Sequence, residues 1–208
     1  MHKKLITACL AIAAFAAFVV APSASAVNLT SNGVTVGVGA SITGTSGLAR
    51  FVAGGSTVTC DHNHMVGTIL VDKEGTIEAT IKADTPTFHG TDKETDCTSN
   101  GLGPVRPTVN SELCLHIANK TDFGTVTGCE GKVVTFTLNV TNLGLACRYE
   151  KASIGTEITT GSNPAAVRIR PGELAKGEAS NSFLCPPEGE LEMEFSLFTT
   201  DGTPLVFS

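Results

Sequence analysis

Three histidines are the side chains of this sequence whose type and spacing could do chemistry. His62 and His64 stand two positions apart shortly after Cys60, and His89 follows further along the chain. In a β-strand, residues i and i+2 point to the same face, so these two imidazoles could chelate one metal ion, with His89 or Asp61 as a third ligand. Such a site predicts a secreted metal-dependent hydrolase. We favour a polar turn between two strands, because two histidines without a defined third ligand are weak evidence for a metal.

The other reactive side chains form no catalytic constellation in the sequence. There is no G-x-S-x-G motif, and His116 stands inside an apolar stretch typical of a strand. Glu192 and Glu194 alternate with apolar residues, as do Arg168 and Arg170, which is typical of the solvent face of a sheet. We therefore expect a protein that is not an enzyme and that holds no cofactor.

The cysteines predict disulfides rather than a metal centre. Cys9 lies in the N-terminal apolar run, which leaves six: Cys60, Cys97, Cys114, Cys129, Cys147 and Cys185. Metal-binding cysteines come in close pairs, whereas the smallest spacing among these six is 15 residues. Spacing alone does not choose among the possible pairings. We favour sequential pairing, which joins Cys60–Cys97, Cys114–Cys129 and Cys147–Cys185 across neighbouring hairpins.

The elements that must position these side chains are β-strands. Apolar residues alternate with polar ones over 34–38, 77–81, 134–140 and 191–197, which is the period of a half-buried strand. Turn signals separate such runs, as at Gly54-Gly55 and Asp201-Gly202. The segment Glu173–Ala179 is the one candidate for a short helix, although Gly177 weakens it. The pattern predicts an all-β protein, an antiparallel β-sandwich or barrel-like fold stapled by disulfides.

The N-terminus has the three parts of a cleaved secretory signal. Lys3 and Lys4 precede an apolar run, and Ala24 and Ala26 occupy the small-residue positions of a cleavage site. We expect cleavage after Ala26, which leaves 27–208 as a single β-sandwich domain. An alternative boundary between two smaller β modules lies near 101–107, where two glycines and two prolines occur.

Charge and composition restrict the partners of the mature chain. Without Lys3 and Lys4 it has 12 Lys and Arg against 20 Asp and Glu, a formal charge of −8. Such a surface repels phosphate backbones and anionic lipids, so we expect no nucleic acid and no stable membrane insertion. Ten Phe, one Tyr and no Trp also leave few rings for a sugar-binding surface, and we expect the Phe residues in the core.

Two short Thr- and Gly-rich stretches carry a resemblance. They are Gly55–Cys60 and Gly124–Cys129, the second followed by Val133–Leu138. In them the chain resembles uncharacterised, small, secreted, Cys-containing β-rich proteins of high-GC Gram-positive bacteria. The resemblance implies export and β structure and brings no established activity.

The sequence thus predicts a secreted, non-catalytic binding or cell-envelope-associated β module. The expected class of partner is an extracellular or envelope protein. Two alternatives stay open, the hydrolase using His62 and His64 and an inhibitor that presents a disulfide-closed loop such as 114–129.

Overall fold

The computed structural model describes residues 27–73, 75–92, 94–118 and 122–208, and in them the chain is almost entirely β. The predicted signal peptide, with its cleavage after Ala26, lies outside the described residues. The strands are β1 (Leu29–Ser31), β2 (Val34–Thr35), β3 (Ser41–Ser46), β4 (Ala49–Ala53), β5 (Ser56–Cys60), β6 (His62–Lys73), β7 (Thr76–Ile81), β8 (Thr87–His89), β9 (Thr98–Ser99), β10 (Val105–Val109), β11 (Leu113–Ile117), β12 (Phe123–Gly128), β13 (Val134–Val140), β14 (Leu145–Lys151), β15 (Ser153–Thr159), β16 (Ala166–Lys176), β17 (Glu188–Thr199) and β18 (Leu205–Phe207). Two short 3-10 turns, η1 (Cys129–Gly131) and η2 (Thr141–Leu143), are the helical elements of this described part.

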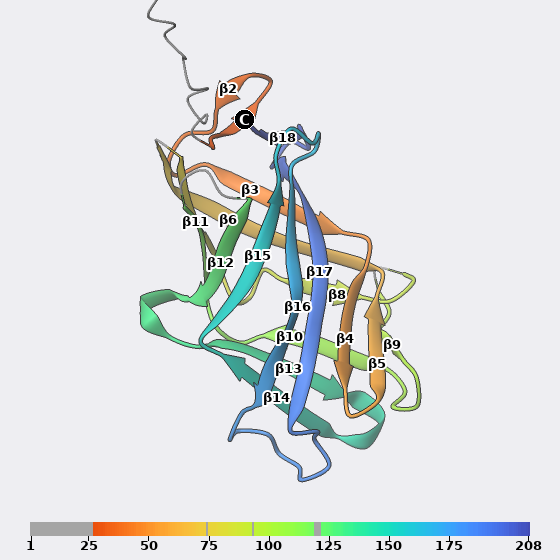
Figure 1. Ribbon diagram of the computed structural model, residues 1–208. Helices are drawn as coiled ribbons and strands as arrows, with labels where there is room; N and C mark the ends of the chain where they lie inside the picture. The colour runs from red at the N-terminus through yellow and green to blue at the C-terminus, as the bar shows by residue number, and fades with distance from the viewer. Residues whose placement is uncertain (1–26, 74, 93, 119–121) are drawn as a thin grey trace, which may run out of the picture.

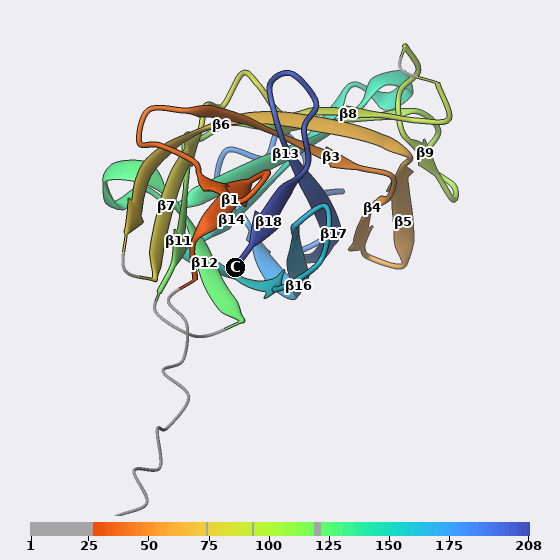
Figure 2. The ribbon, with the colours of Figure 1, turned by 90° about the horizontal axis from the view of Figure 1, so that it is seen from above.

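Eight of the strands close into an antiparallel barrel (Figures 1 and 2). Their order round the barrel is β16-β15-β12-β11-β7-β6-β3-β17, and the pairing of β17 with β16 completes the circle. Closure pairs the backbone groups that open sheet edges would leave free. The all-β, antiparallel, barrel-like fold predicted from the alternating sequence is therefore confirmed.

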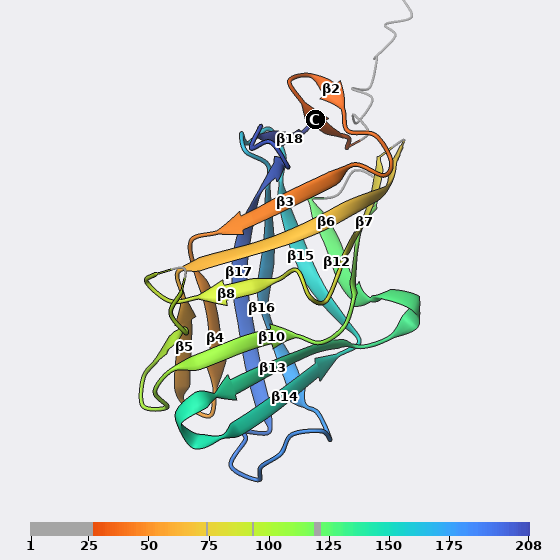
Figure 3. The same cartoon turned by 180° about the vertical axis from the view of Figure 1, so that it is seen from behind.

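Two sets of extra strands continue the sheet beyond the barrel (Figure 3). On one side β17 pairs with β4, followed by β5 and β9, and on the other β16 pairs with β14, followed by β13 and β10. An isolated antiparallel bridge between Cys97 and Val105 joins the two sets, so the extra strands curve round a second interior space. Residues on both sides of 101–107 belong to this one sheet and to one core.

The strands β16 and β17 belong both to the barrel and to the sets of extra strands, because each changes its partner strand along its length. Residues 166–169 of β16 pair with β15, the register shifts between Ile169 and Gly172, and Ala175–Lys176 pair with β14. Pro171 stands inside the irregularity, where its missing N–H breaks no ladder bond. In the same way β17 pairs with β4 through Gly189–Met193 and with β3 through Ser196–Thr199.

Burial follows the alternation where strands are long. Leu191, Met193, Phe195 and Leu197 of β17 are buried, and Glu194 between them is exposed. The same holds for 77–81 and 134–140, although Thr135 is buried as well.

Two local expectations are wrong. The alternation at 34–38 does not make a half-buried strand, because β2 ends at Thr35 and the chain turns at Gly39, which has a positive φ. Val34 and Val38 are exposed, and only Val36 of this set is buried. The segment Glu173–Ala179 is not a helix, since its residues through Lys176 pair with β17 and β14.

Three disulfides hold the structure, Cys60–Cys97, Cys114–Cys129 and Cys147–Cys185. This is the sequential pairing that we favour from the sequence among the possible ones, and three bridges indicate an oxidising compartment. Among the described residues, no helix has the length and apolar character that a membrane span requires.

Candidate functional site

The three histidines lie together on the outer surface of the sheet. His62 and His64 share one face of β6, and His89 of β8 stands opposite His62 in the strand register. The Nε2–H of His62 donates to the carbonyl oxygen of Thr91 at 2.9 Å. The rings border an open hollow with Thr45 and Thr87. Within the described parts of the chain, no three His, Cys, Asp or Glu side chains are grouped so that they could hold a metal ion.

The strand arginines pair with acidic side chains of neighbouring strands. Arg168 donates to Glu192 at 2.7 Å, and Arg170 forms an ion pair with Glu157. The Arg170 guanidinium also lies 4.9 Å from the ring centroid of Phe123. Such exposed pairs contribute at most about 1 kcal/mol each, and here they join strands of the sheet.

The loop considered for an inhibitor is only partly described. The Cys114–Cys129 bridge ties β11 to the end of β12, while residues 119–121 at the connection of the two strands lie outside the described residues. His116 of β11 faces out, with its Nδ1 3.1 Å from Glu78 Oε1 on the neighbouring strand. This histidine therefore belongs to a surface pair.

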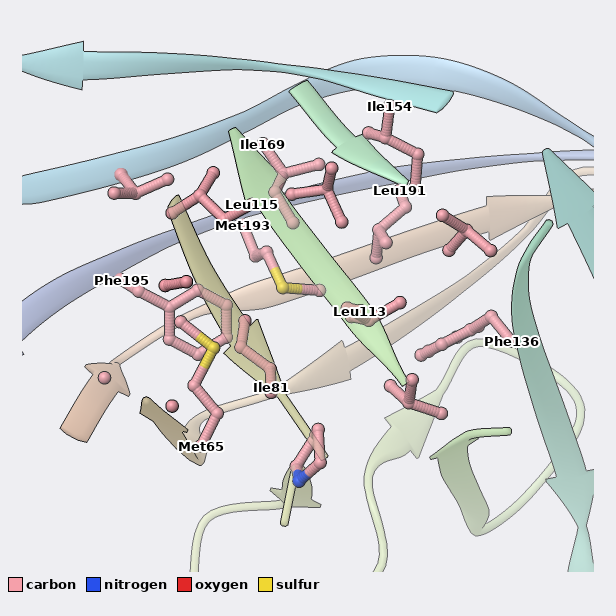
Figure 4. Close-up of a pocket in the computed structure, with 18 of the residues that line it drawn as sticks. Met65, Ile81, Leu113, Leu115, Phe136, Ile154, Ile169, Leu191, Met193 and Phe195 are labelled. Carbon is pink, nitrogen blue, oxygen red and sulfur yellow. The ribbon is translucent and has the colours of Figure 1, made fainter. Parts of the chain in front are cut away.

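The interior of the barrel contains a cavity of about 70 Å³, which we call the barrel cavity. Figure 4 shows side chains from several strands directed into it, among them Met65, Leu115, Met193 and Phe195. An eight-stranded barrel has an interior that side chains just fill or that holds one small ligand. The volume left here is about half of the roughly 150 Å³ that holds a benzene molecule in an engineered apolar cavity.

A larger cavity of about 220 Å³, which we call the end cavity, lies between the extra strands. Val58, Leu138, Val140 and Cys147 line its walls, and Leu184 of the β16–β17 loop lies at its rim. Apart from Ser56 and Tyr149, the lining side chains carry no oxygen. The β16–β17 loop, residues 177–187, extends beyond the strands at the lower end of the molecule in Figure 1.

Tyr149 of β14 stands between the two spaces and is the one described residue that lines both. Its ring lies 4.9 Å from that of Phe51, which in turn stacks on Phe136 at 5.6 Å between centroids. Tyr149 is only 1 % exposed, and its hydroxyl has no hydrogen-bond partner within the described structure. Burial raises the pKa of Tyr149 to about 12, so the hydroxyl remains a protonated donor across the neutral range.

The two cavities are therefore lined mainly by apolar side chains, with the hydroxyl-bearing Tyr149 at both, Thr135 at the barrel cavity and Ser56 at the end cavity. No Asp, Glu, His, Lys or Arg is among the described residues that line either space. Such a lining can enclose an apolar molecule and offers no acid–base pair for a reaction.

Tyr149 is not among the residues that the sequence motifs single out. A signal was present, since the one tyrosine of the chain alternates with Leu145 and Cys147 on the inner face of a strand. Alternation in a sequence does not show whether a buried hydroxyl has a hydrogen-bond partner.

Comparison with known proteins adds no identification. No protein-family model, no curated protein and no solved structure matches this chain.

Proposed function

We propose that this protein is a secreted, non-catalytic binding protein that encloses one small apolar molecule in the end cavity. The observation that carries the proposal is that space of about 220 Å³, with walls of buried aliphatic and aromatic side chains. Concave apolar pockets with few convergent polar groups are the usual form of small-molecule sites. The export signal expected at 1–26 and the three disulfides support an extracellular or cell-envelope location.

Cavity size limits the ligand. Scaled from an engineered cavity of about 150 Å³ that holds benzene, the end cavity has room for about nine non-hydrogen atoms. At roughly 0.5–0.8 kcal/mol per atom, such a ligand binds with a Kd of about 10 µM to 1 mM. The protein is therefore suited to a small volatile or fragment-sized compound present at high local concentration.

Calorimetry and ligand-observed NMR with α-methylstyrene, a planar apolar compound of suitable size, test the proposal. We expect saturable one-to-one binding to the oxidised protein. The variant Ala53→Leu places a larger side chain into the end cavity, where Ala53 lines the wall, and we expect it to abolish binding.

The matched control is Ala79→Val, which enlarges a buried residue that lines only the barrel cavity. It should leave binding unchanged, with circular dichroism showing both variants folded. Absence of saturable binding to the wild-type protein, or equal binding by Ala53→Leu, would overturn the proposal.

A further inference from the structure

We propose that the ligand carries a single hydrogen-bond acceptor on an apolar skeleton, a carbonyl or ether oxygen, and that the hydroxyl of Tyr149 donates to it. This inference rests on the proposed function and names the chemical class of the ligand.

The position of Tyr149 is the first argument. It lines the end cavity together with Phe51, Leu138 and Cys147, so a ligand in that space contacts its ring. The side chain is 1 % exposed, and its hydroxyl has no partner within the described residues. A buried hydroxyl without a partner destabilises a fold, whereas phenylalanine would offer the same ring without that cost. An acceptor on the ligand removes the cost when the ligand binds.

The rest of the lining limits the ligand to one buried hydrogen-bond acceptor. Ser56 is the other oxygen-bearing side chain of the end cavity, and it lies at the start of β5, next to the turn at Gly54 and Gly55 and half-buried. Apart from Ser56, Tyr149 and the disulfide-bonded Cys147, the lining side chains are hydrocarbon, so a second polar group on the ligand would be buried against carbon. The Tyr149 hydroxyl is protonated at neutral pH and can donate one hydrogen bond, which a carbonyl or ether oxygen of the ligand accepts.

Two probes of the same shape test the inference. Acetophenone and α-methylstyrene have nearly the same planar skeleton, and differ in a carbonyl oxygen that replaces a methylene group. We expect the wild-type protein to bind acetophenone about five- to tenfold more tightly. In Tyr149→Phe this preference should vanish, because acetophenone binding falls while α-methylstyrene binding stays the same or increases.

Retained α-methylstyrene binding shows that Tyr149→Phe is folded. A second readout uses the single tyrosine of the chain, whose ring Cζ resonance needs no assignment against others. It should shift with acetophenone in the direction of a donated hydrogen bond and shift less with α-methylstyrene.

The two failures can be told apart. If both probes bind the wild-type protein and Tyr149→Phe with equal affinity, the acceptor inference is overturned and the apolar site stands. If neither probe binds the wild-type protein, the proposed function fails and this inference fails with it.

Discussion

Removal of the Cys147–Cys185 disulfide should weaken both the fold and the end cavity. The bridge closes a segment of 38 residues, and the chain-entropy relation gives a stabilisation of about 4 kcal/mol for such a loop. Cys147 itself lines the end cavity, and Cys185 lies between Leu184 and Pro186, which also line it. In the double variant Cys147→Ala/Cys185→Ala we expect this loss of stability and at least about fivefold weaker α-methylstyrene binding, because the loop is no longer held at the rim.

The Cys114–Cys129 bridge supplies the matched control. It closes 15 residues, and the same relation gives about 3 kcal/mol. Neither cysteine lines the end cavity. The variant Cys114→Ala/Cys129→Ala should therefore be destabilised by a similar amount while its affinity stays within about twofold of the wild type.

Urea unfolding followed by tyrosine fluorescence measures the stability, since the chain has one Tyr and no Trp and the signal reports on Tyr149 alone. Calorimetry, at a temperature where all proteins are folded, measures the affinity. Unchanged binding in Cys147→Ala/Cys185→Ala would refute the idea that this loop shapes the cavity. Equal loss of affinity in both double variants would show that general destabilisation, and not the rim, controls binding.

Four further predictions concern single groups. Gly189→Ala should destabilise the protein by about 1–3 kcal/mol in urea unfolding, because a Cβ there collides with the ring of Phe51; Gly155→Ala, where a Cβ meets nothing, should have a much smaller effect. Burial raises the folded-state pKa of Tyr149 to about 12, whereas an unfolded tyrosine has a pKa of about 10. The free energy of unfolding is therefore unaffected below about pH 10 and falls by about 2–3 kcal/mol as the pH rises from about 10 to about 12. Tyr149→Phe should lack this loss, and a tyrosinate absorbance titration with a midpoint near that of free tyrosine would contradict the buried hydroxyl. Burial also raises the pKa of Asp72, although the hydrogen bond from Leu29 N–H opposes this, so the stability that the protonated carboxyl contributes is present at low pH and is lost as the carboxyl ionises. Asp72→Asn can still accept that bond, so it should have a higher Tm than the wild type at neutral pH and an equal Tm in acid. A lower Tm at neutral pH would count against this explanation. Zn²⁺ calorimetry should show no saturable heat, because His62 Nε2 is bonded to the Thr91 carbonyl and no three potential ligands of the described residues are grouped so that they could hold a metal ion. Saturable binding that is lost in His64→Asn would restore the hydrolase alternative.

The sequence predicted the fold class because alternation and burial agree in the long strands. Leu191 to Leu197 of β17 show why: each apolar side chain of the run faces the core, and the strand pairs on both edges. The short pattern at Val34–Val38 failed because a local signal cannot tell whether a partner strand continues beside it. Glu173 was misread for a related reason, since its place is fixed by pairing with Glu190, a neighbour distant in the sequence.

The disulfides could be expected, and the cavities could not. The wide spacing of the six cysteines indicates disulfides, and sequential pairing is the choice that closes local loops between hairpins, whose turns leave signals in a sequence. A cavity depends on volumes that side chains fail to fill, and it has no period along the chain. Tyr149 shows the difference, because its inward direction follows from alternation with Cys147, whereas its missing partner follows from the packing of Phe51 and Phe136 around it.

The shared strands explain why this fold has two interior spaces that meet at Tyr149. Because β16 and β17 change partners near the irregularity at Pro171, the sheet turns from a closed barrel into a second ring of strands. Phe51, Phe136 and Tyr149 pack where the two meet. Phe136 and Tyr149 line the small barrel cavity on one side, and Phe51 and Tyr149 line the larger end cavity on the other. A phenylalanine at position 149 would pack as well as tyrosine. The buried hydroxyl therefore contributes favourably only when an acceptor in the cavity receives a hydrogen bond from it.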